Sequence, residues 1–227
     1  MKILRLLALI AMASLTQSSF AQAGTTFNEA GGLERSVVTN ARKAETATGS
    51  QYFSEVFVPA NVKDKGITLI RYNAYTDQIE YKNNLDKVSP LPSEKDVIIT
   101  TTDKRNAFEY LDYTTDENEN ISGYLNLISN NDKVKIYSRL RVFLQDATEP
   151  TSGYTTYKPA NYKKASTKYF IRIKEKSVVA LPTRKKDLIS MFPGKDKEIA
   201  AFIKENKISL SEEEDLKKLG EYLNTLS

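Results

Sequence analysis

The stretch ISGYLNLISNNDKVKIYSRLRVFL, residues 121–144, decides the fold that we predict for this chain. From Val134 to Leu144 every second residue is apolar or small, and most of the residues between them are basic or aromatic. A period of two places the two sets on opposite faces of a β-strand. Asn130-Asn131-Asp132 precedes this strand, and such residues tolerate the positive φ of a hairpin turn. We therefore predict a hairpin in which strand 121–128 pairs with strand 134–144.

Shorter strand signals lie on both sides of this hairpin. Runs rich in β-branched and aromatic residues, separated by turn residues, predict strands at 52–58, 66–72, 78–81, 97–102, 108–112, 169–173 and 178–181. Pro59 is expected to end the first of them. Strands at hairpin spacing followed by helices favour the α+β class. We predict a β-rich domain over residues 51–182, mainly an antiparallel sheet that forms a sandwich or an open barrel.

The apolar period changes after Pro182, and residues 183–227 are predicted to hold two or three short helices. Helical stripes lie at 188–192 and 199–206, and leucines recur at helical spacing towards the end of the chain. Ser211 followed by Glu214 predicts a capping box at the start of the last helix. Helices this short need a partner for their apolar faces: the sheet, one another or another protein.

The N-terminus has the pattern of a secretory signal peptide. Lys2 and Arg5 provide a basic start, an apolar run to Leu15 follows, and Ala21-Gln22-Ala23 supplies the small residues of a cleavage site. The apolar run is too short to span a bilayer. We predict a signal peptide over residues 1–23, cleaved after Ala23, and a flexible leader over residues 24–50.

Composition excludes several chemistries. The chain has no His and no Cys, so imidazole bases, thiol nucleophiles, thiolate metal sites and disulfides are absent. Its 33 basic and 29 acidic residues give a net charge of +4, which is too small to predict a nucleic-acid partner. The chemistry left open uses carboxylates, Ser-Lys pairs, Tyr, and calcium or magnesium held by oxygen ligands.

Neither a metal site nor a carboxylate pair emerges from the spacing. Asp116, Asn118 and Asn120 fit the first ligands of an EF-hand loop, but Ile121 and Leu127 replace the Gly and Glu that such a loop requires. We interpret this segment as an acidic hairpin loop and predict no cofactor. A glycan hydrolase needs two facing carboxylates, and the candidates on or near predicted strands are Glu55, Glu80, Glu109 and Asp112.

Tyrosine is the most distinctive residue of the chain, with 13 copies. Tyr suits interfaces, because it offers a large area and a hydroxyl at low entropic cost, although it also simply favours strands. The loop from Tyr154 to Tyr162 is the segment that we most expect to bind another molecule, because functional surfaces tend to lie on loops. Its candidate binding residues are Tyr154, Tyr157, Tyr162 and Lys158.

Four segments, 71–81, 186–192, 202–210 and 213–219, resemble parts of an uncharacterised family of exported Bacteroidota proteins. The order of signal peptide, β-rich region and helical tail is also similar. The resemblance covers most of the chain from about Tyr52 onward. It implies a bacterial protein that is periplasmic or associated with the outer membrane, and it supplies no catalytic residues.

Together these observations favour an exported, non-enzymatic binding or accessory protein of the bacterial envelope. Its partner would be an outer-membrane or periplasmic protein or a small ligand, and no transmembrane segment is expected in the mature chain. Two alternatives stay open: a carboxylate-dependent glycan hydrolase and a soluble ligand carrier of the periplasm.

Overall fold

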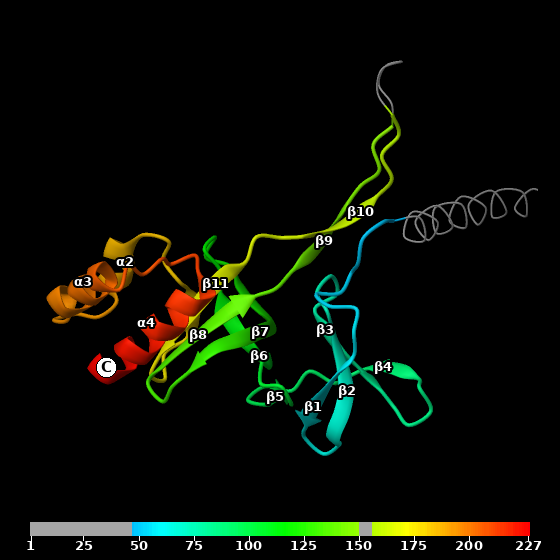
Figure 1. Cartoon of the computed structure of the whole chain (residues 1–227), viewed down its shortest axis with the longest axis horizontal. Helices are drawn as coiled ribbons and strands as arrows, with labels where there is room; N and C mark the ends of the chain where they lie inside the picture. Colours follow the sequence, from blue (N-terminus) through cyan, green and yellow to red (C-terminus); the bar gives the residue numbers. More distant parts are fainter. Residues whose placement is uncertain (1–46, 150–155) are drawn as a thin grey trace, which may run out of the picture. The chain divides into compact units, whose positions relative to one another are not determined.

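The computed structural model describes residues 47–149 and 156–227 (Figure 1). The predicted α+β class is confirmed: strands dominate, and three helices follow them near the C-terminus. The strands are β1 (Val58–Val62), β2 (Gly66–Asn73), β3 (Gln78–Lys82), β4 (Val88–Pro90), β5 (Ile98–Thr101), β6 (Ala107–Thr114), β7 (Asn120–Asn130), β8 (Val134–Arg139), β9 (Val142–Gln145), β10 (Asn161–Lys164), β11 (Lys168–Ile173) and β12 (Val178–Ala180). The helices are α2 (Lys185–Ser190), α3 (Asp196–Glu205) and α4 (Glu213–Leu226).

Five strands close into a small barrel. Strands β6, β7, β8, β11 and β12 follow one another as antiparallel neighbours, and β12 also pairs in parallel with β6. The closing pairs join Val178 to Tyr113 and Val179 to Thr114. Apolar side chains, among them Leu125, Tyr137 and Phe170, fill the inside. The sequence left a sandwich and an open barrel as alternatives, and the β6–β12 pairing closes the barrel.

The predicted hairpin is present as β7 and β8, but the prediction of one strand from Val134 to Leu144 is wrong. Strand β8 ends at Arg139, and β9 begins at Val142 with new neighbours. The Val142 amide donates to the Ala74 carbonyl at 3.1 Å, and β9 pairs with β10 in a separate two-stranded sheet. The chain changes strand partners here because the Leu140 side chain packs into a second apolar cluster, which lies outside the barrel.

That second cluster lies under strands β1 to β5, which continue the sheet beyond β6 in the order β5-β1-β2-β3-β4. The prediction of a strand at 52–58 ended by Pro59 is wrong, since β1 begins at Val58 and contains Pro59. The Pro59 carbonyl accepts from the Thr102 amide at 2.8 Å on the β5 side of β1. Its missing N–H faces the same side, so Pro59 removes no bond of the β1–β2 ladder.

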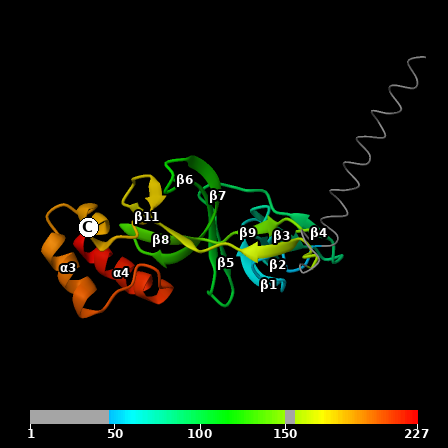
Figure 2. The same ribbon diagram turned by 90° about the horizontal axis from the view of Figure 1, so that it is seen from above.

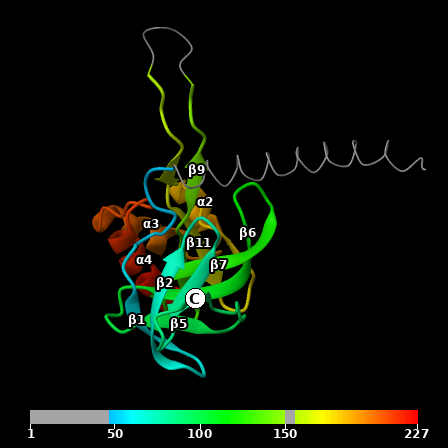
Figure 3. The ribbon, with the colours of Figure 1, turned by 90° about the vertical axis from the view of Figure 1, so that its right-hand side faces the viewer.

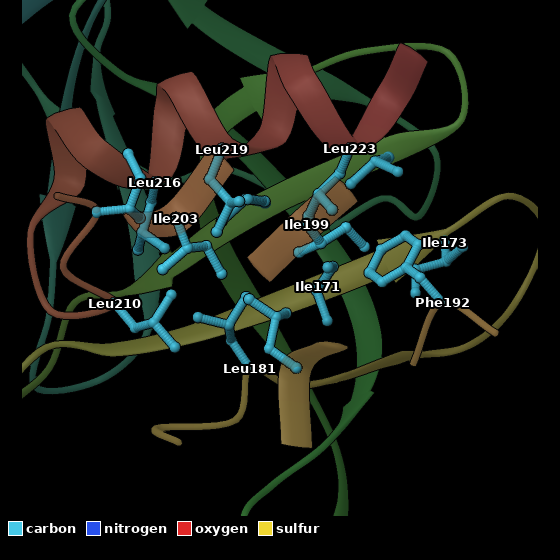
Figure 4. Packing of buried hydrophobic residues seen from close by; sticks show 14 residues of the cluster. Ile171, Ile173, Leu181, Phe192, Ile199, Ile203, Leu210, Leu216, Leu219 and Leu223 are labelled. Carbon is cyan, nitrogen blue, oxygen red and sulfur yellow. The ribbon is translucent and has the colours of Figure 1, made fainter. Parts of the chain in front are cut away.

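The helices cover one side of the barrel strands (Figures 1 and 2). Leu216, Leu219 and Leu223 of α4 pack against Ile171 and Ile173 of β11 in one buried cluster with residues of α2 and α3 (Figure 4). The apolar stripe of the tail is therefore buried against the chain's own sheet. In the described residues no helix is long and apolar enough to cross a membrane.

The predicted capping box at α4 is wrong. The N-cap residue is Glu212, and it makes no side-chain capping bond. Glu214 pairs with Lys217 at 2.7 Å instead. Asp215 accepts from the Ser209 amide at 3.0 Å, so a carboxylate of the first turn reaches back to the preceding loop. That placement also puts negative charge at the positive end of the helix dipole.

Candidate functional site

Strands β9 and β10 form a two-stranded ribbon that leads away from the barrel and the neighbouring sheet (Figures 1 and 3). Beyond these strands the ribbon continues to Thr148 and Lys158, whose amides and carbonyls bond mutually at 2.9 and 3.1 Å. We call residues 142–149 and 156–164 the arm. A two-stranded ribbon is marginally stable alone in water, so the arm depends on contacts at its base.

Three of the four predicted binding residues lie on the arm, and Tyr154 lies outside the described residues. Tyr157 is 50% exposed, and Lys158 is exposed beside it. Tyr162 is half-buried, with its ring edge-on to Tyr75 at 5.2 Å between centroids and an interplanar angle of 74°. Tyr157 and Lys158 are thus free to meet another molecule, whereas Tyr162 helps to hold the base of the arm.

The sequence did not single out Phe143, which is 48% exposed on β9 directly across from Lys163 on β10. Lys164 lies next along the strand, and its ammonium sits over the Phe53 ring at 4.5 Å. A signal for Phe143 was present: in the period-two pattern it falls on the face opposite the core residues. An apolar residue on that face either packs against another part of the chain or forms part of a surface that binds a partner.

A polar network anchors the arm where β8 gives way to β9. The Arg141 guanidinium binds both carboxylate oxygens of Asp77, at 2.9 and 2.6 Å, and also contacts the Tyr72 hydroxyl. Tyr72 donates to Asp77 at 2.8 Å. Burial raises the pKa of Tyr72 well above its usual value, so the phenol stays neutral and remains a donor.

Backbone geometry makes room for this network. Asp77 has a φ of +56°, in the left-handed region that Asp tolerates in turns. Its carboxylate accepts from the Tyr124 amide on β7 at 3.3 Å. The neighbouring Gly123 has no side chain, and a Cβ there would collide with the Asp77 carboxylate. The turn between β2 and β3, strand β7 and the base of the arm are therefore joined at one point.

Three of the four carboxylates proposed for hydrolysis have separate partners. Glu80 pairs with Arg71 at 2.7 Å. Glu109 is buried and accepts from the Tyr137 hydroxyl at 3.0 Å.

Asp112 pairs with Lys95 at 2.6 Å, and Glu55 lies in an exposed bend. Glu80, Glu109 and Asp112 thus each bind a local donor. Over the described ranges, no group of three or more acidic side chains is placed to hold a metal ion.

Comparison of the chain with protein-family models, with curated proteins and with solved structures found no match.

Proposed function

We propose that this chain is an exported, non-enzymatic binding protein of the bacterial envelope, and that its arm contacts another envelope protein. The observation that carries the proposal is the exposure of Phe143 and Tyr157 on a ribbon that projects from the sheets. Aromatic side chains of this kind are enriched where proteins meet. The signal-peptide pattern of residues 1–23 supports the export part of the proposal.

The distribution of apolar surface favours the arm over the helical tail. The leucines of α4 and the isoleucines of α3 are buried against the barrel, so the tail has no open stripe to offer a partner. On the arm, in contrast, the aromatic groups stand beside charged ones. Lys158 and Lys163 are exposed near Tyr157 and Phe143. A partner surface with a shallow apolar pocket and carboxylates at its rim would match this chemistry.

Site-specific photocrosslinking tests the proposal. A photoreactive phenylalanine derivative replaces Phe143 in one variant and Tyr157 in another, and Leu85 in a control. Leu85 is 86% exposed and lies in the turn between β3 and β4, away from the arm. Each variant is expressed in the native envelope, irradiated and purified, and its adducts are identified by mass spectrometry.

We expect the two arm variants to give the same crosslinked protein and the Leu85 variant not to give it. The substitution Phe143→Ser should then reduce recovery of that protein about tenfold or more, in line with the loss of an interface aromatic. Adducts shared equally by all three positions, or none from either arm position, would overturn the role of the arm.

A further inference from the structure

Two neighbouring hairpins carry the most exposed large apolar side chains of the described residues. Leu85, in the turn between β3 and β4, is 86% exposed, and Ile67, beside the turn between β1 and β2, is 75% exposed. Leu69 and Val88 of the same two hairpins are exposed as well. Single exposed apolar residues are ordinary on a protein surface, whereas several at one place mark a contact with another molecule or with a membrane.

The strand register places the two turns at the same end of the sheet. Strands β2 and β3 are antiparallel with Leu69 opposite Lys82, so the beginning of β2 lies beside the end of β3. The β1–β2 turn leads into the first of these ends, and the β3–β4 turn leaves the second. An open groove of about 460 Å³ joins the turns, since Lys65 and Thr68 line it together with Lys82 and Leu85. We call the turns 63–67 and 83–88 the tips.

The β3–β4 tip holds its own backbone amides. The Asn83 side-chain oxygen accepts from the amides of Leu85 and Lys87 at 2.9 and 3.0 Å. The Asn83 carbonyl accepts from the Asp86 amide at 3.0 Å. Amides that are bonded within the turn lose less on leaving water than open amides do. This tip can therefore carry Leu85 out of water at a low polar cost.

The charges of the tips and of the adjoining Lys82 favour an anionic surface. Together these residues include four lysines and two aspartates. Two of the lysines pair with acids at 3.2 and 3.3 Å, whereas Lys65 and Lys87 make no ion pair with the described residues. The Lys65 ammonium lies 4.7 Å from the centre of the Tyr81 ring, and both residues line the groove. Lysines placed in this way are attracted to the anionic headgroups of a bilayer.

We propose that the two tips bind the surface of a bilayer that contains anionic lipids. Leu85 and Ile67 enter the boundary between headgroups and acyl chains, and a lipid phosphate lies in the groove lined by Lys65 and Lys82. The strength of such binding combines apolar insertion with attraction between charges. The projecting groups are aliphatic and cationic, unlike the Trp, Tyr and Arg anchors that dominate protein interfaces. The inference does not depend on the arm or on its partner.

Vesicle flotation tests the proposal with the full protein purified after export. One set of vesicles contains equal parts of phosphatidylglycerol and phosphatidylcholine, and the other contains phosphatidylcholine alone. The variants are Leu85→Ser and Lys65→Gln. Each is compared with the parent from the same preparation, so that any lipid binding by the N-terminal segment is common to all of them.

Val56→Ser and Lys104→Gln are the matched controls. Val56 is 67% exposed and precedes β1, and Lys104 is exposed in the turn between β5 and β6. Because β1 and β5 are antiparallel, with Ala60 opposite Thr101, both controls lie at the end of β1 away from the tips.

A single dye label reports insertion directly. The chain has no Cys, so Leu85→Cys and Val56→Cys each accept one environment-sensitive dye. On vesicles that contain phosphatidylglycerol, the dye at position 85 should shift its emission to shorter wavelength, because it enters a less polar layer. The dye at position 56 should keep its emission.

We expect the parent to bind the anionic vesicles about tenfold or more tightly than phosphatidylcholine alone, since each lysine near an anionic surface adds about fivefold. Leu85→Ser should weaken binding about five- to tenfold, as partial burial of one leucine allows, and Lys65→Gln about fivefold. Both controls should bind as the parent does.

Three results would each overturn the proposal. The first is no binding to either set of vesicles, which would leave the tips to a protein partner. The second is a loss in the control variants as large as that in Leu85→Ser. The third is release of the protein by glycerol 3-phosphate at the same phosphate concentration as the vesicles, which would identify a free phosphate ester as the ligand.

Discussion

Replacing Gly220 by Ala tests how closely helix α4 approaches the sheet. In an isolated helix this change would stabilise the helix by about 1 kcal/mol, because glycine is a poor helix former. Here a Cβ would lie 2.9 Å from the Ser129 Cβ and 3.2 Å from the Ile136 Cδ1, and still closer to the Ser129 hydroxyl oxygen. Overpacking of this kind costs about 1–3 kcal/mol, so the steric cost should exceed the helical gain.

The side chains around this contact have little room to move away from an added Cβ. The Ser129 hydroxyl is held by the Asn131 side-chain amide at 2.7 Å, and Ile136 is fully buried. We expect Gly220→Ala to lower the free energy of unfolding by about 1–2 kcal/mol and the Tm by about 2–8 °C. Because the chain has no Trp, urea unfolding is best followed by circular dichroism.

Two further variants isolate the steric cause. Glu221→Ala, at the exposed neighbouring position, should change stability by less than about 0.5 kcal/mol. Adding Ser129→Gly to Gly220→Ala removes the colliding atoms, so the two substitutions should couple favourably in a double-mutant cycle. A Gly220→Ala protein as stable as the parent, or more stable, would refute the close contact and the packing of α4 derived from it.

Two other predictions concern charged groups. Arg141→Met leaves the Asp77 carboxylate without its main partner, and we expect a loss of about 3 kcal/mol in urea unfolding; an unchanged midpoint would show that the network stabilises nothing. The hydrogen bond from Lys168 lowers the pKa of Asp116 in the folded protein below its usual 3.8. The ionised carboxylate therefore stabilises the fold above pH 3.8, and this stabilisation is lost as the pH falls through the lower pKa of the folded state. Asp116→Asn should therefore lower the Tm at pH 7 but not at pH 2, and equal shifts at both values would contradict the ion pair.

Most individual strands could be predicted because their signals are local. The turn at Asn130–Asp132 and the alternation that follows it specify β7 and β8 within a few residues. The end of β8 could not be predicted, since the alternation runs on through Leu140 and Arg141 without a break. It ends where Leu140 packs into the second apolar cluster and Arg141 pairs with Asp77, a residue 64 positions earlier in the chain, and no short window of sequence contains both partners.

Barrel closure was hidden for the same reason. Strand β12 looks like one half of a hairpin with β11, and its second, parallel pairing with β6 depends on curvature that accumulates over five strands. The capping box at the start of α4 was predicted wrongly for a different reason. Ser211 and Glu214 have the right spacing, but the acidic run from Glu212 offers several carboxylates that could bind a backbone amide near the start of the helix. In the folded chain Asp215 does so, by accepting from the Ser209 amide.

The candidate site was predictable in part. Tyr157 and Lys158 were expected from composition, and both are exposed on the arm. Tyr162 has the same residue type but packs on Tyr75, which lies in a turn far away in the sequence.

The parallel pairing of β6 with β12 has a consequence for the order in which the molecule assembles. During synthesis, which proceeds from the N-terminus, residue 113 emerges well before its partner, residue 178. Until then the end of β6 at Tyr113 and Thr114 has an open edge, and such an edge can template pairing with other chains. Pairings so distant in sequence also form slowly. The nascent chain should therefore pass through an aggregation-prone interval, which lasts until residue 178 has emerged.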